Sequence, residues 1–421
     1  MKIVLCNKYF FLNGGTEKYL QVLLRHLPRH GHEAIPFSVR YAGSWPSSYS
    51  TYFLDPPGDP THTHLSTIRI TPANSLRFLT RSIYSCEARE ALARLLAAIG
   101  GADIAYVLNI YNYMSPSIID TFYRHDIPIV MQVGDYNLVC PAYTLLRNNR
   151  PCTLCIFGAF HHGIIHRCVK HHLAASMVRV VAMYIHRWIK IYDRVAAFVV
   201  PCRFMKNILI QGGFAPNRIH LLQYPVPPED LPVRQPKENY MLYFGRLSPE
   251  KGIDTLIKAY QAATPPVNLV IAGRSYDNEE ERLRRLVLPQ FQDRIRFIGF
   301  TEGSTLSKLI GGALFSVVPS RWYDNAPISI YESFAHYTPV VASAIGGIPE
   351  QIEDTVTGKL FPPDNVQALA ASILWMLEDR ARLEAMGAAG RAFVQEHLGV
   401  DRHINALIEL FSEARSATRK G

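Results

Sequence analysis

Short apolar runs and amphipathic segments alternate along the whole chain, and the pattern restarts in the second half. In the first half, apolar runs of strand length lie at residues 2–5, 34–39, 104–108, 127–133 and 195–200. In the second half, similar runs lie at residues 240–244, 267–272, 294–298, 313–318 and 339–342. Segments with helical spacing separate the runs, among them residues 76–99, 253–263 and 366–377. Strands that alternate with helices are typical of parallel sheets covered on both faces, so we expect an α/β fold.

A proline-rich stretch from Pro225 to Pro236 lies between the two halves and has the composition of a linker. A chain of 421 residues is long enough for two domains that each bury a core. We therefore place a first domain at residues 1–225 and a second at residues 226–400, followed by a final helical segment at residues 401–421.

Residues 319–333 carry the first candidate site. They follow an apolar run and lead into a predicted helix, with Pro327 suited to the first helical turn. Asp324 then lies in the loop before the helix, and Glu332 lies one to two turns inside it. A helix N-terminus suits phosphate, whereas carboxylates accept hydrogen bonds from hydroxyls. A nucleotide-diphosphate sugar carries both groups, although an ordinary strand–turn–helix with a capping aspartate has the same pattern.

Two basic residues, Arg246 and Lys251, lie in the loop that follows the apolar run at residues 240–244. Ligands of open α/β sheets bind beyond the carboxyl ends of the strands, so we expect both residues to converge with Asp324. There they would clamp a diphosphate and stabilise the negative charge that grows on it as it leaves. Isolated, they would be solvated surface charges. The chain has no Asp-x-Asp motif, so a metal held by carboxylates is not expected in this role.

Gly14 and Gly15 form a glycine pair between the first apolar run and a predicted helix. Strand, glycine loop and helix in this order are typical of a site where the backbone approaches phosphate, although a glycine pair is also common in flexible turns. The chain contains neither G-x-G-x-x-G nor the P-loop motif, which argues against a dinucleotide-binding fingerprint and a P-loop NTPase.

One predicted helix in the first half has an apolar stripe formed by Met177, Val180, Val181, Tyr184, Ile185, Trp188, Ile189 and Tyr192. Basic residues lie off the stripe. A stripe of this kind commonly packs on the core of its domain, but a helix lying on a membrane surface has the same pattern. No uninterrupted run of 18 apolar residues occurs, so no segment is expected to span a bilayer.

The formal net charge of +9 suits anionic partners, but no basic block with interleaved aromatic residues indicates nucleic-acid binding. The seven cysteines are an odd number and no export signal is recognised, so we expect a reducing, cytoplasmic compartment. Four thiols, Cys140, Cys152, Cys155 and Cys168, include one C-x-x-C pair. They fit a structural zinc site and buried reduced thiols about equally well, so the metal content stays open.

The second half contains a series of short motifs: Gly245-Arg246, Glu250-Lys251-Gly252, Ala272-Gly273, Pro319-Ser320, the pair Asp324 and Glu332, Gly346-Gly347 and Thr357-Gly358. In these motifs it resembles the retaining glycosyltransferases of family 4. The first half is similar in Gly14-Gly15-x-Glu17 and in the motif from Asp135 to Pro141.

The resemblance implies a GT-B fold, in which two Rossmann-like domains face each other across a central cleft and the final helix crosses back to the first domain. It implies that Arg246 and Lys251 grip the donor diphosphate, that Glu332 holds the ribose hydroxyls, and that Asp324 holds the transferred sugar. Backbone N–H groups near Asn325 and Ala326 would assist, and Gly14 and Gly15 would line the donor site.

The implied activity is metal-independent transfer of a hexose-type sugar, with retained configuration and no cofactor, from a nucleotide-diphosphate sugar to a glycan or lipid-linked acceptor. Polysaccharide or lipopolysaccharide assembly at the inner face of a membrane fits this activity.

Two positions depart from the family pattern. The family usually has glutamate where Asp324 stands, and it often has histidine where this chain has Gly134. A non-catalytic relative that binds nucleotide sugars therefore stays an alternative, as does a nucleotide-sugar epimerase.

Overall fold

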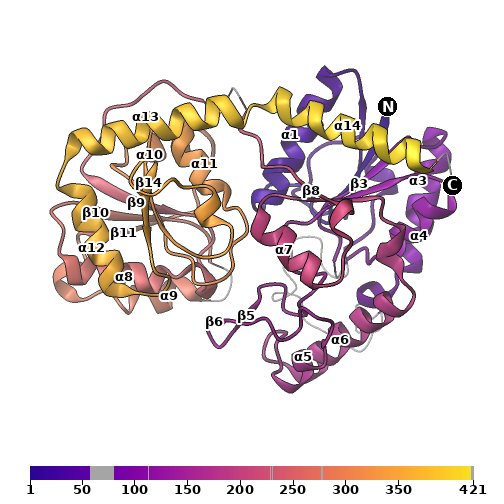
Figure 1. Cartoon of the computed structure of the whole chain (residues 1–421), viewed down its shortest axis with the longest axis horizontal. Helices are drawn as coiled ribbons and strands as arrows, with labels where there is room; N and C mark the ends of the chain where they lie inside the picture. Colours follow the sequence, from indigo (N-terminus) through magenta and orange to yellow (C-terminus); the bar gives the residue numbers. More distant parts are fainter. Residues whose placement is uncertain (57–79, 112, 228, 230, 276–277, 419–421) are drawn as a thin grey trace. The chain divides into compact units, whose positions relative to one another are not determined.

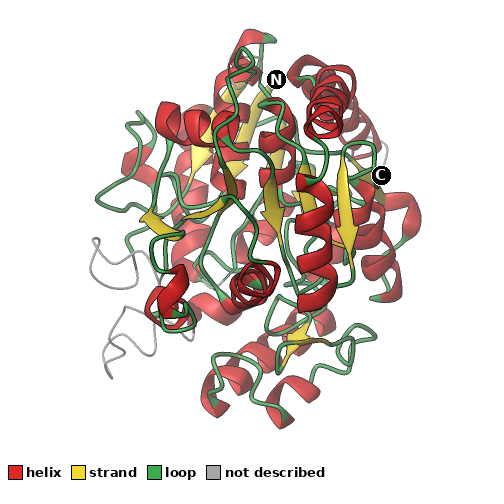
Figure 2. Cartoon of the chain, turned by 90° about the vertical axis from the view of Figure 1, so that its left-hand side faces the viewer, coloured by secondary structure: helices red, strands yellow, loops and turns green. Residues whose placement is uncertain are grey.

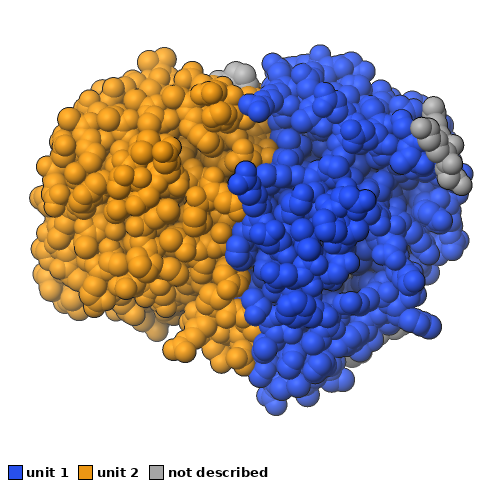
Figure 3. Space-filling model, in the orientation of Figure 1, with its two compact units in different colours: residues 1–145, 153–222, 401–421 blue, residues 146–152, 223–400 orange. Residues whose placement is uncertain are grey.

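The computed structural model describes residues 1–56, 80–111, 113–227, 229, 231–275 and 278–418. The chain divides into two compact units, which Figure 3 shows in different colours. Unit 1 consists of residues 1–145, 153–222 and 401–421, and unit 2 consists of residues 146–152 and 223–400. Each unit is built on its own parallel sheet (Figure 1).

The sheet of unit 1 has six strands in the order β2-β1-β3-β4-β7-β8, and neighbouring strands pair in parallel. The strands are β1 Lys2–Cys6, β2 Glu33–Phe37, β3 Ile104–Val107, β4 Ile129–Gln132, β7 Ala197–Val200 and β8 Ile219–Leu221. The first five of these strands coincide with the five apolar runs of the first half, and β8 is an additional strand. The central strands are buried along their whole length, because helices cover a parallel sheet on both faces.

The helices of this part of the chain connect the strands. They are α1 Gly15–Arg29, α3 Cys86–Ile99, α4 Ser117–Arg124, α5 His162–Ile165, α6 Leu173–Trp188 and α7 Arg203–Gln211. A small antiparallel pair, β5 Leu146–Arg147 and β6 Arg150–Pro151, precedes α5. Single 3-10 turns lie at Ser50–Tyr52, Ile191–Arg194 and Pro216–Arg218.

The helix predicted at residues 76–99 is interrupted in the structure. Residues 76–79 lie outside the described ranges, residues 80–83 are helical, and α3 begins at Cys86. Ser85 interrupts the helical pattern because its side chain caps α3, where it accepts a hydrogen bond from the backbone N–H of Ala88 at 3.1 Å.

The helix predicted from the stripe at residues 177–192 also needs correction. α6 ends at Trp188, and Lys190 adopts a left-handed conformation, so the stripe is not continuous to Tyr192. Most of the stripe does not pack on the core either, because the buried face of α6 is formed by Ser176, Arg179, Val180, Ala182, Met183 and His186. Three polar side chains, Ser176, Arg179 and His186, occupy that face, which is why hydrophobic spacing alone did not identify the buried side of the helix.

The sheet of unit 2 has the order β11-β10-β9-β12-β13-β14 and is likewise parallel. Its strands are β9 Tyr240–Phe244, β10 Asn268–Ala272, β11 Ile295–Gly299, β12 Ser316–Val318, β13 Val340–Ser343 and β14 Gly358–Phe361. The helices are α8 Ile253–Ala263, α9 Glu279–Arg284, α10 Gly303–Gly312, α11 Ile328–Ala335, α12 Val366–Leu377 and α13 Arg380–His397. Single 3-10 turns lie at Pro249–Lys251, Pro289–Phe291 and Ile348–Glu350. Figure 2 looks toward this unit and shows helices on both sides of the strands.

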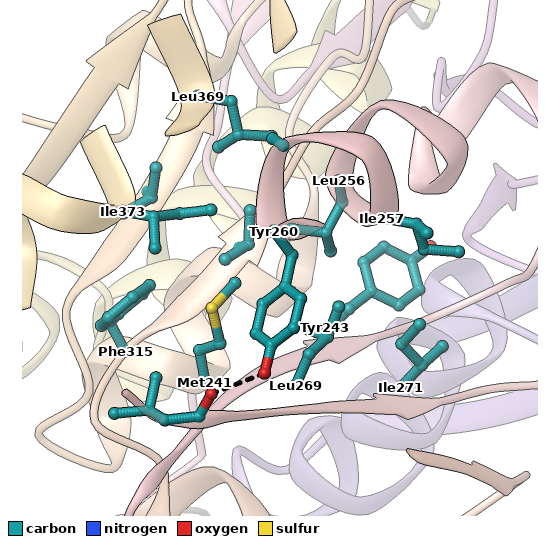
Figure 4. Close-up of a cluster of buried hydrophobic side chains, with 14 of the residues drawn as sticks. Met241, Tyr243, Leu256, Ile257, Tyr260, Leu269, Ile271, Phe315, Leu369 and Ile373 are labelled. Atoms are coloured by element: carbon teal, nitrogen blue, oxygen red, sulfur yellow. Dashed lines mark hydrogen bonds between the residues drawn. The ribbon is translucent and has the colours of Figure 1, made fainter. Parts of the chain in front are cut away.

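Alternate residues of the central strands of unit 2 enter two different cores. Met241 and Tyr243 of β9 pack on one face of the sheet together with α8 and α12 (Figure 4), whereas Leu242 and Phe244 belong to the cluster on the other face. Tyr260 of α8 is fully buried in the first cluster and donates its hydroxyl hydrogen bond to the carbonyl of Val267 at 2.7 Å. Burial on both faces explains why these strands read as unbroken apolar runs.

The last helix, α14 Val400–Thr418, contacts α1 and the loop before β3 in unit 1. His403 lies 2.8 Å from the Tyr19 hydroxyl of α1, and Arg415 forms an ion pair with Asp103 at 2.5 Å. Within the described ranges, no helix combines the length and the hydrophobicity needed to cross a bilayer.

Candidate active site

Two glycines shape the carboxyl edge of the sheet of unit 2 at the exits of β9 and β10. Gly245 has a φ of +143°, which side-chain-bearing residues rarely adopt. A Cβ on Gly273 would lie 1.9 Å from the carbonyl oxygen of Gly245, so the two backbones approach as closely as only glycine permits. The close approach fixes the start of the loop that carries Arg246 and Lys251.

Arg246 is held at this edge by two contacts. Its guanidinium donates to Glu250 Oε1 at 2.7 Å, and its carbonyl accepts a hydrogen bond from the Tyr243 hydroxyl at 2.8 Å. Its side chain remains 38% exposed, whereas that of Glu250 is 13% exposed. The pair therefore orients a cation that a ligand can still reach.

Lys251 and Asp324 form the most buried ion pair among the predicted site residues. Lys251 Nζ lies 2.6 Å from Asp324 Oδ2, and the side chains are 20% and 4% exposed. Ser320 donates a second hydrogen bond to the same oxygen at 2.9 Å, and the Lys251 ammonium lies 5.4 Å from the centroid of the Trp322 ring. An ammonium carries three donors, so Lys251 keeps hydrogen-bonding capacity toward a ligand while the carboxylate holds it in place.

Glycines also position the loops on each side of this ion pair. Gly252 follows Lys251 with a φ of +68°, and a Cβ there would lie 2.0 Å from the carbonyl oxygen of Pro319. Gly346 has a φ of +62°, and a Cβ there would lie 2.3 Å from the carbonyl oxygen of Asp324. The same carbonyl accepts a hydrogen bond from the N–H of Gly347 at 2.8 Å. These contacts give a physical reason for the glycines of the motif.

Arg321 ties the loop before Asp324 to α8 and was not expected as a site residue. It is 4% exposed and donates to Asp254 Oδ1 at 2.6 Å and to Asp364 Oδ1 at 3.0 Å. Its backbone N–H donates to the carbonyl of Glu250 at 3.0 Å. Arg321 therefore joins the loop that carries Asp324 to the loop that carries Lys251.

The remaining residues predicted in unit 2 lie at the start of α11. Pro327 is the residue that caps α11 and is one position earlier than expected, since the helix begins at Ile328. Asn325 and Ala326 are buried, and the N–H of Ala326 donates to Asn325 Oδ1 at 2.7 Å. Glu332 lies inside α11, where its carbonyl oxygen is 2.7 Å from His336 Nδ1. The structure thus brings together Lys251 and Asp324, whereas the hydroxyl-binding role of Glu332 stays a prediction.

Gly14 and Gly15 belong to unit 1. Gly14 has extended backbone and precedes the first residue of α1, Gly15, and its carbonyl accepts a hydrogen bond from Lys18 at 3.1 Å. A Cβ on Gly14 would meet only Glu17 Oε2, at the ordinary contact distance of 3.6 Å. Neither the backbone nor the packing of unit 1 requires glycine at this position.

A buried acidic group, Glu17, and a partly buried one, Asp135, lie near Gly14 and Gly134 at the carboxyl edge of the sheet of unit 1. Glu17 is 4% exposed and accepts a hydrogen bond from Asn7 at 3.0 Å. Burial raises the pKa values of Glu17 and Asp135, and the nearby Lys8 opposes the rise in both. Motif spacing drew attention to Glu17 and Asp135, but no sequence signal indicated that Lys8 acts on both.

Asp135 is oriented from α6 through one intermediate residue. Asn137 donates from Nδ2 to Asp135 Oδ1 at 2.9 Å and to Oδ2 at 2.8 Å. The buried Arg179 of α6 donates to Asn137 Oδ1 at 3.0 Å and to its carbonyl at 2.8 Å. The chain Arg179–Asn137–Asp135 therefore connects the buried face of α6 to the edge of the sheet.

The described part of the chain contains no group of three or more His, Cys, Asp or Glu side chains arranged to hold a metal ion. Cys140 and Cys155 are buried, and Cys152 and Cys168 are partly buried. The four thiols thus belong to no such group among the described residues, and two of them are not fully buried.

Two family models together match most of the chain. The model described as Glycosyltransferase Family 4 matches residues 13–230, which is more than half of the chain, and the model described as Glycosyl transferases group 1 matches residues 231–393.

Similar curated proteins include two mannosyltransferases. One is the GDP-mannose-dependent monoacylated alpha-(1-6)-phosphatidylinositol monomannoside mannosyltransferase of Corynebacterium glutamicum, which is 34% identical over 159 residues. That match covers 36% of this chain and 41% of the relative. The O-antigen chain mannosyltransferase B of Escherichia coli is 31% identical over 181 residues, which cover 39% of this chain and 45% of the relative. The chain thus spans about two fifths of the length of these relatives.

Solved structures resemble the chain over nearly its full length. Sucrose-phosphate synthase from Thermosynechococcus elongatus has a TM-score of 0.71 at 18% identity and covers 99% of both chains. Anabaena HepE in complex with UDP and glucose has a TM-score of 0.66 at 16% identity and covers 98% of this chain and 99% of its own. At this level of identity the likeness concerns the fold, and it confirms the expected GT-B fold with two Rossmann-like domains.

Proposed function

Because the chain belongs to glycosyltransferase family 4, we propose that it transfers a hexose-type sugar from a nucleotide-diphosphate sugar to a glycan or lipid-linked acceptor. The proposed transfer retains the anomeric configuration and requires neither a metal nor a cofactor. The acceptor would be part of a growing polysaccharide or lipopolysaccharide, reached from the cytoplasmic face of a membrane.

The observation that carries the proposal is the ion pair of Lys251 with Asp324, together with the partly exposed Arg246 in the same loop after β9. When the sugar–phosphate bond breaks, negative charge grows on the departing diphosphate. Two cations fixed by carboxylates can stabilise that charge without having to reorganise during the reaction. In this proposal Arg246 and Lys251 take the role that a bound metal ion plays in other transferases.

Asp324 would serve two purposes in this scheme. Its Oδ2 receives the hydrogen bonds of Lys251 and Ser320, so a hydroxyl of the transferred sugar would bind at Oδ1. Glu332 would accept hydrogen bonds from the ribose hydroxyls, and backbone groups near Asn325 and Ala326 would contact the donor. Gly14 and Gly15 would allow the donor to approach the backbone of unit 1, which fits the finding that the unit itself does not require glycine at position 14.

The proposal is tested first by the binding of the donor. A ligand that binds only the folded protein raises its melting temperature by mass action, so a panel of nucleotide-diphosphate sugars should contain at least one that does so. Arg246→Ala should weaken binding of that donor by about 10- to 100-fold, because a charge-assisted hydrogen bond to the diphosphate is lost.

A matched control is available in the same unit. Arg284 of α9 pairs with Glu280 at 2.7 Å, and its partner is four residues away in the sequence, as Glu250 is from Arg246. Arg284→Ala should therefore bind the donor like the wild type. Equal binding by wild type and Arg246→Ala would contradict the assignment.

The two alternatives predict different products. A non-catalytic relative would bind the donor but neither hydrolyse it nor transfer the sugar. An epimerase would convert the donor with no acceptor present. Product analysis of the bound donor with and without an acceptor glycan distinguishes both from a transferase.

A further inference from the structure

Exposed large apolar side chains are concentrated in one region of unit 1. Of the 17 exposed large hydrophobic residues in the described ranges, eight lie between residues 154 and 188: Leu154, Phe157, Ile165, Leu173, Met177, Val181, Tyr184 and Trp188. Trp188 is 83% exposed, Phe157 is 72% exposed and Ile165 is 65% exposed. Exposed apolar groups in such concentration mark an interaction surface rather than ordinary protein surface.

These residues lie on α5, on α6 and on the loop that precedes them. On α6, Leu173, Met177, Val181, Tyr184 and Trp188 follow helical spacing and form one exposed face. We name the eight residues together the α5–α6 surface. α5 and α6 lie side by side, as Figure 1 also shows.

The α5–α6 surface packs on a small buried cluster of unit 1. Phe160, Val180 and Met183 form a small buried cluster beneath it, and a Cβ on Gly163 of α5 would lie 3.0 Å from a methyl group of Val180. The hydroxyl of Tyr184 accepts a hydrogen bond from the N–H of His161 at 3.1 Å. The apolar face is therefore presented by a packed helix pair.

The segment of unit 1 that forms this surface carries only positive formal charge. Residues 153–192 contain no aspartate or glutamate, but they contain the five basic residues Arg167, Lys170, Arg179, Arg187 and Lys190. The rest of the chain has 39 Lys and Arg against 35 Asp and Glu, so this segment supplies five of the nine net positive charges. Apart from Arg179, these basic residues are exposed.

We propose that the α5–α6 surface docks the protein on an anionic lipid bilayer, with the apolar face of α6 inserted at the level of the headgroups and the surrounding lysines and arginines on lipid phosphates. A helix that presents an aromatic and aliphatic face with basic residues beside it is suited to the bilayer interface. The uniform positive charge disfavours a second copy of this chain as the occupant, because like charges would face each other. It complements the anionic headgroups of a bilayer over the whole surface.

The position of α6 relates the docking to the binding of the acceptor. The opposite face of the helix carries the buried Arg179, which reaches Asp135 through Asn137. A bilayer bound by α6 would therefore hold a lipid-linked acceptor close to the edge of the sheet where Asp135 lies. This purpose rests on the proposed function, whereas the docking itself does not.

Flotation of the full-length protein with vesicles tests the docking without any donor. The wild type should float with phosphatidylcholine vesicles that contain phosphatidylglycerol and should stay at the bottom with pure phosphatidylcholine. The double variant Met177→Ser, Trp188→Ser should lose most of the bound fraction, because it removes apolar groups from the inserted face. The variant Arg167→Gln, Arg187→Gln should also bind less and should lose its residual binding at lower salt than the wild type.

Matched controls carry the same changes at exposed positions elsewhere. The double variant Val356→Ser, Leu374→Ser and the single variant Arg285→Gln change exposed residues of unit 2. Both should float like the wild type. Failure of the wild type to bind anionic vesicles, or equal flotation of the α6 variant, would overturn the proposal.

Thermal-shift binding of the donor separates this proposal from the proposed function. Both variants of the α5–α6 surface should bind the donor like the wild type, since they change no residue of the predicted donor site. Loss of donor binding in every protein, with intact flotation, would instead refute only the proposed function.

Discussion

At the scale of single residues, backbone conformation, close packing and one ion pair explain the geometry of the candidate site. Gly252 and Gly346 combine positive φ values with backbone approaches that a Cβ would block, and together they place Lys251 and Asp324 in contact. The sequence indicated that these four residues matter. It did not indicate that Asp324 is nearly buried and neutralised by Lys251, because an ion pair across 73 positions depends on the fold.

Gly14 provides the sharpest prediction for a single residue. Gly14→Ala should leave the stability of the protein nearly unchanged, because the backbone is extended and the new methyl group makes only ordinary contact with Glu17. It should nevertheless weaken donor binding by about tenfold, which corresponds to about 1.4 kcal/mol, if the donor lies against this backbone. Urea unfolding and donor titration measure the two effects separately. Gly346→Ala is the contrasting control, since it should reduce stability through strain at Asp324.

At the scale of elements, strands were predicted better than helices. Each apolar run contains a strand, and the central strands are buried on both faces, so hydrophobicity alone identifies them. The predictions for residues 76–99 and 177–192 differed from the structure for local reasons. Ser85 caps α3 inside a stretch with continuous helical spacing, and Arg179 and His186 occupy the buried face of α6, where the hydrophobic pattern expected apolar residues.

His186 makes α6 sensitive to acid. Its Nε2 lies 2.6 Å from the carbonyl oxygen of Ile83, and burial lowers the pKa of His186 to about 4. Because an unfolded histidine takes up a proton near pH 6.5, unfolding becomes more favourable as the pH falls from 6.5 toward 4, and the group costs nothing above that range. Urea unfolding at pH 7 and pH 4.5 should show a loss of stability that is smaller by about 2 kcal/mol in His186→Gln than in the wild type. An identical loss in both proteins would show that folding does not lower the pKa of His186.

At the scale of the whole molecule, the two-domain α/β architecture followed from the repeated pattern and from the proline-rich stretch near residue 225. The family motifs added the GT-B fold, which the structural likeness confirms. The pattern could not place residues 146–152, which group with unit 2 although they lie in the sequence between two segments of unit 1. It also could not reveal that the apolar stripe of α6 faces outward, because periodicity identifies an apolar face without stating what covers it.

The central claim is that Arg246 and Lys251 stabilise a departing diphosphate. The most direct test is the turnover of the identified donor with its acceptor by the wild type and by Lys251→Ala, with Lys359→Ala as a control, since Lys359 pairs with Asp354 on the same unit. Lys251→Ala should lower kcat by about 100- to 1,000-fold, as expected when one stabilising donor is removed from a transition state, while Lys359→Ala should retain wild-type kcat. A kcat of Lys251→Ala close to that of the wild type would contradict the account.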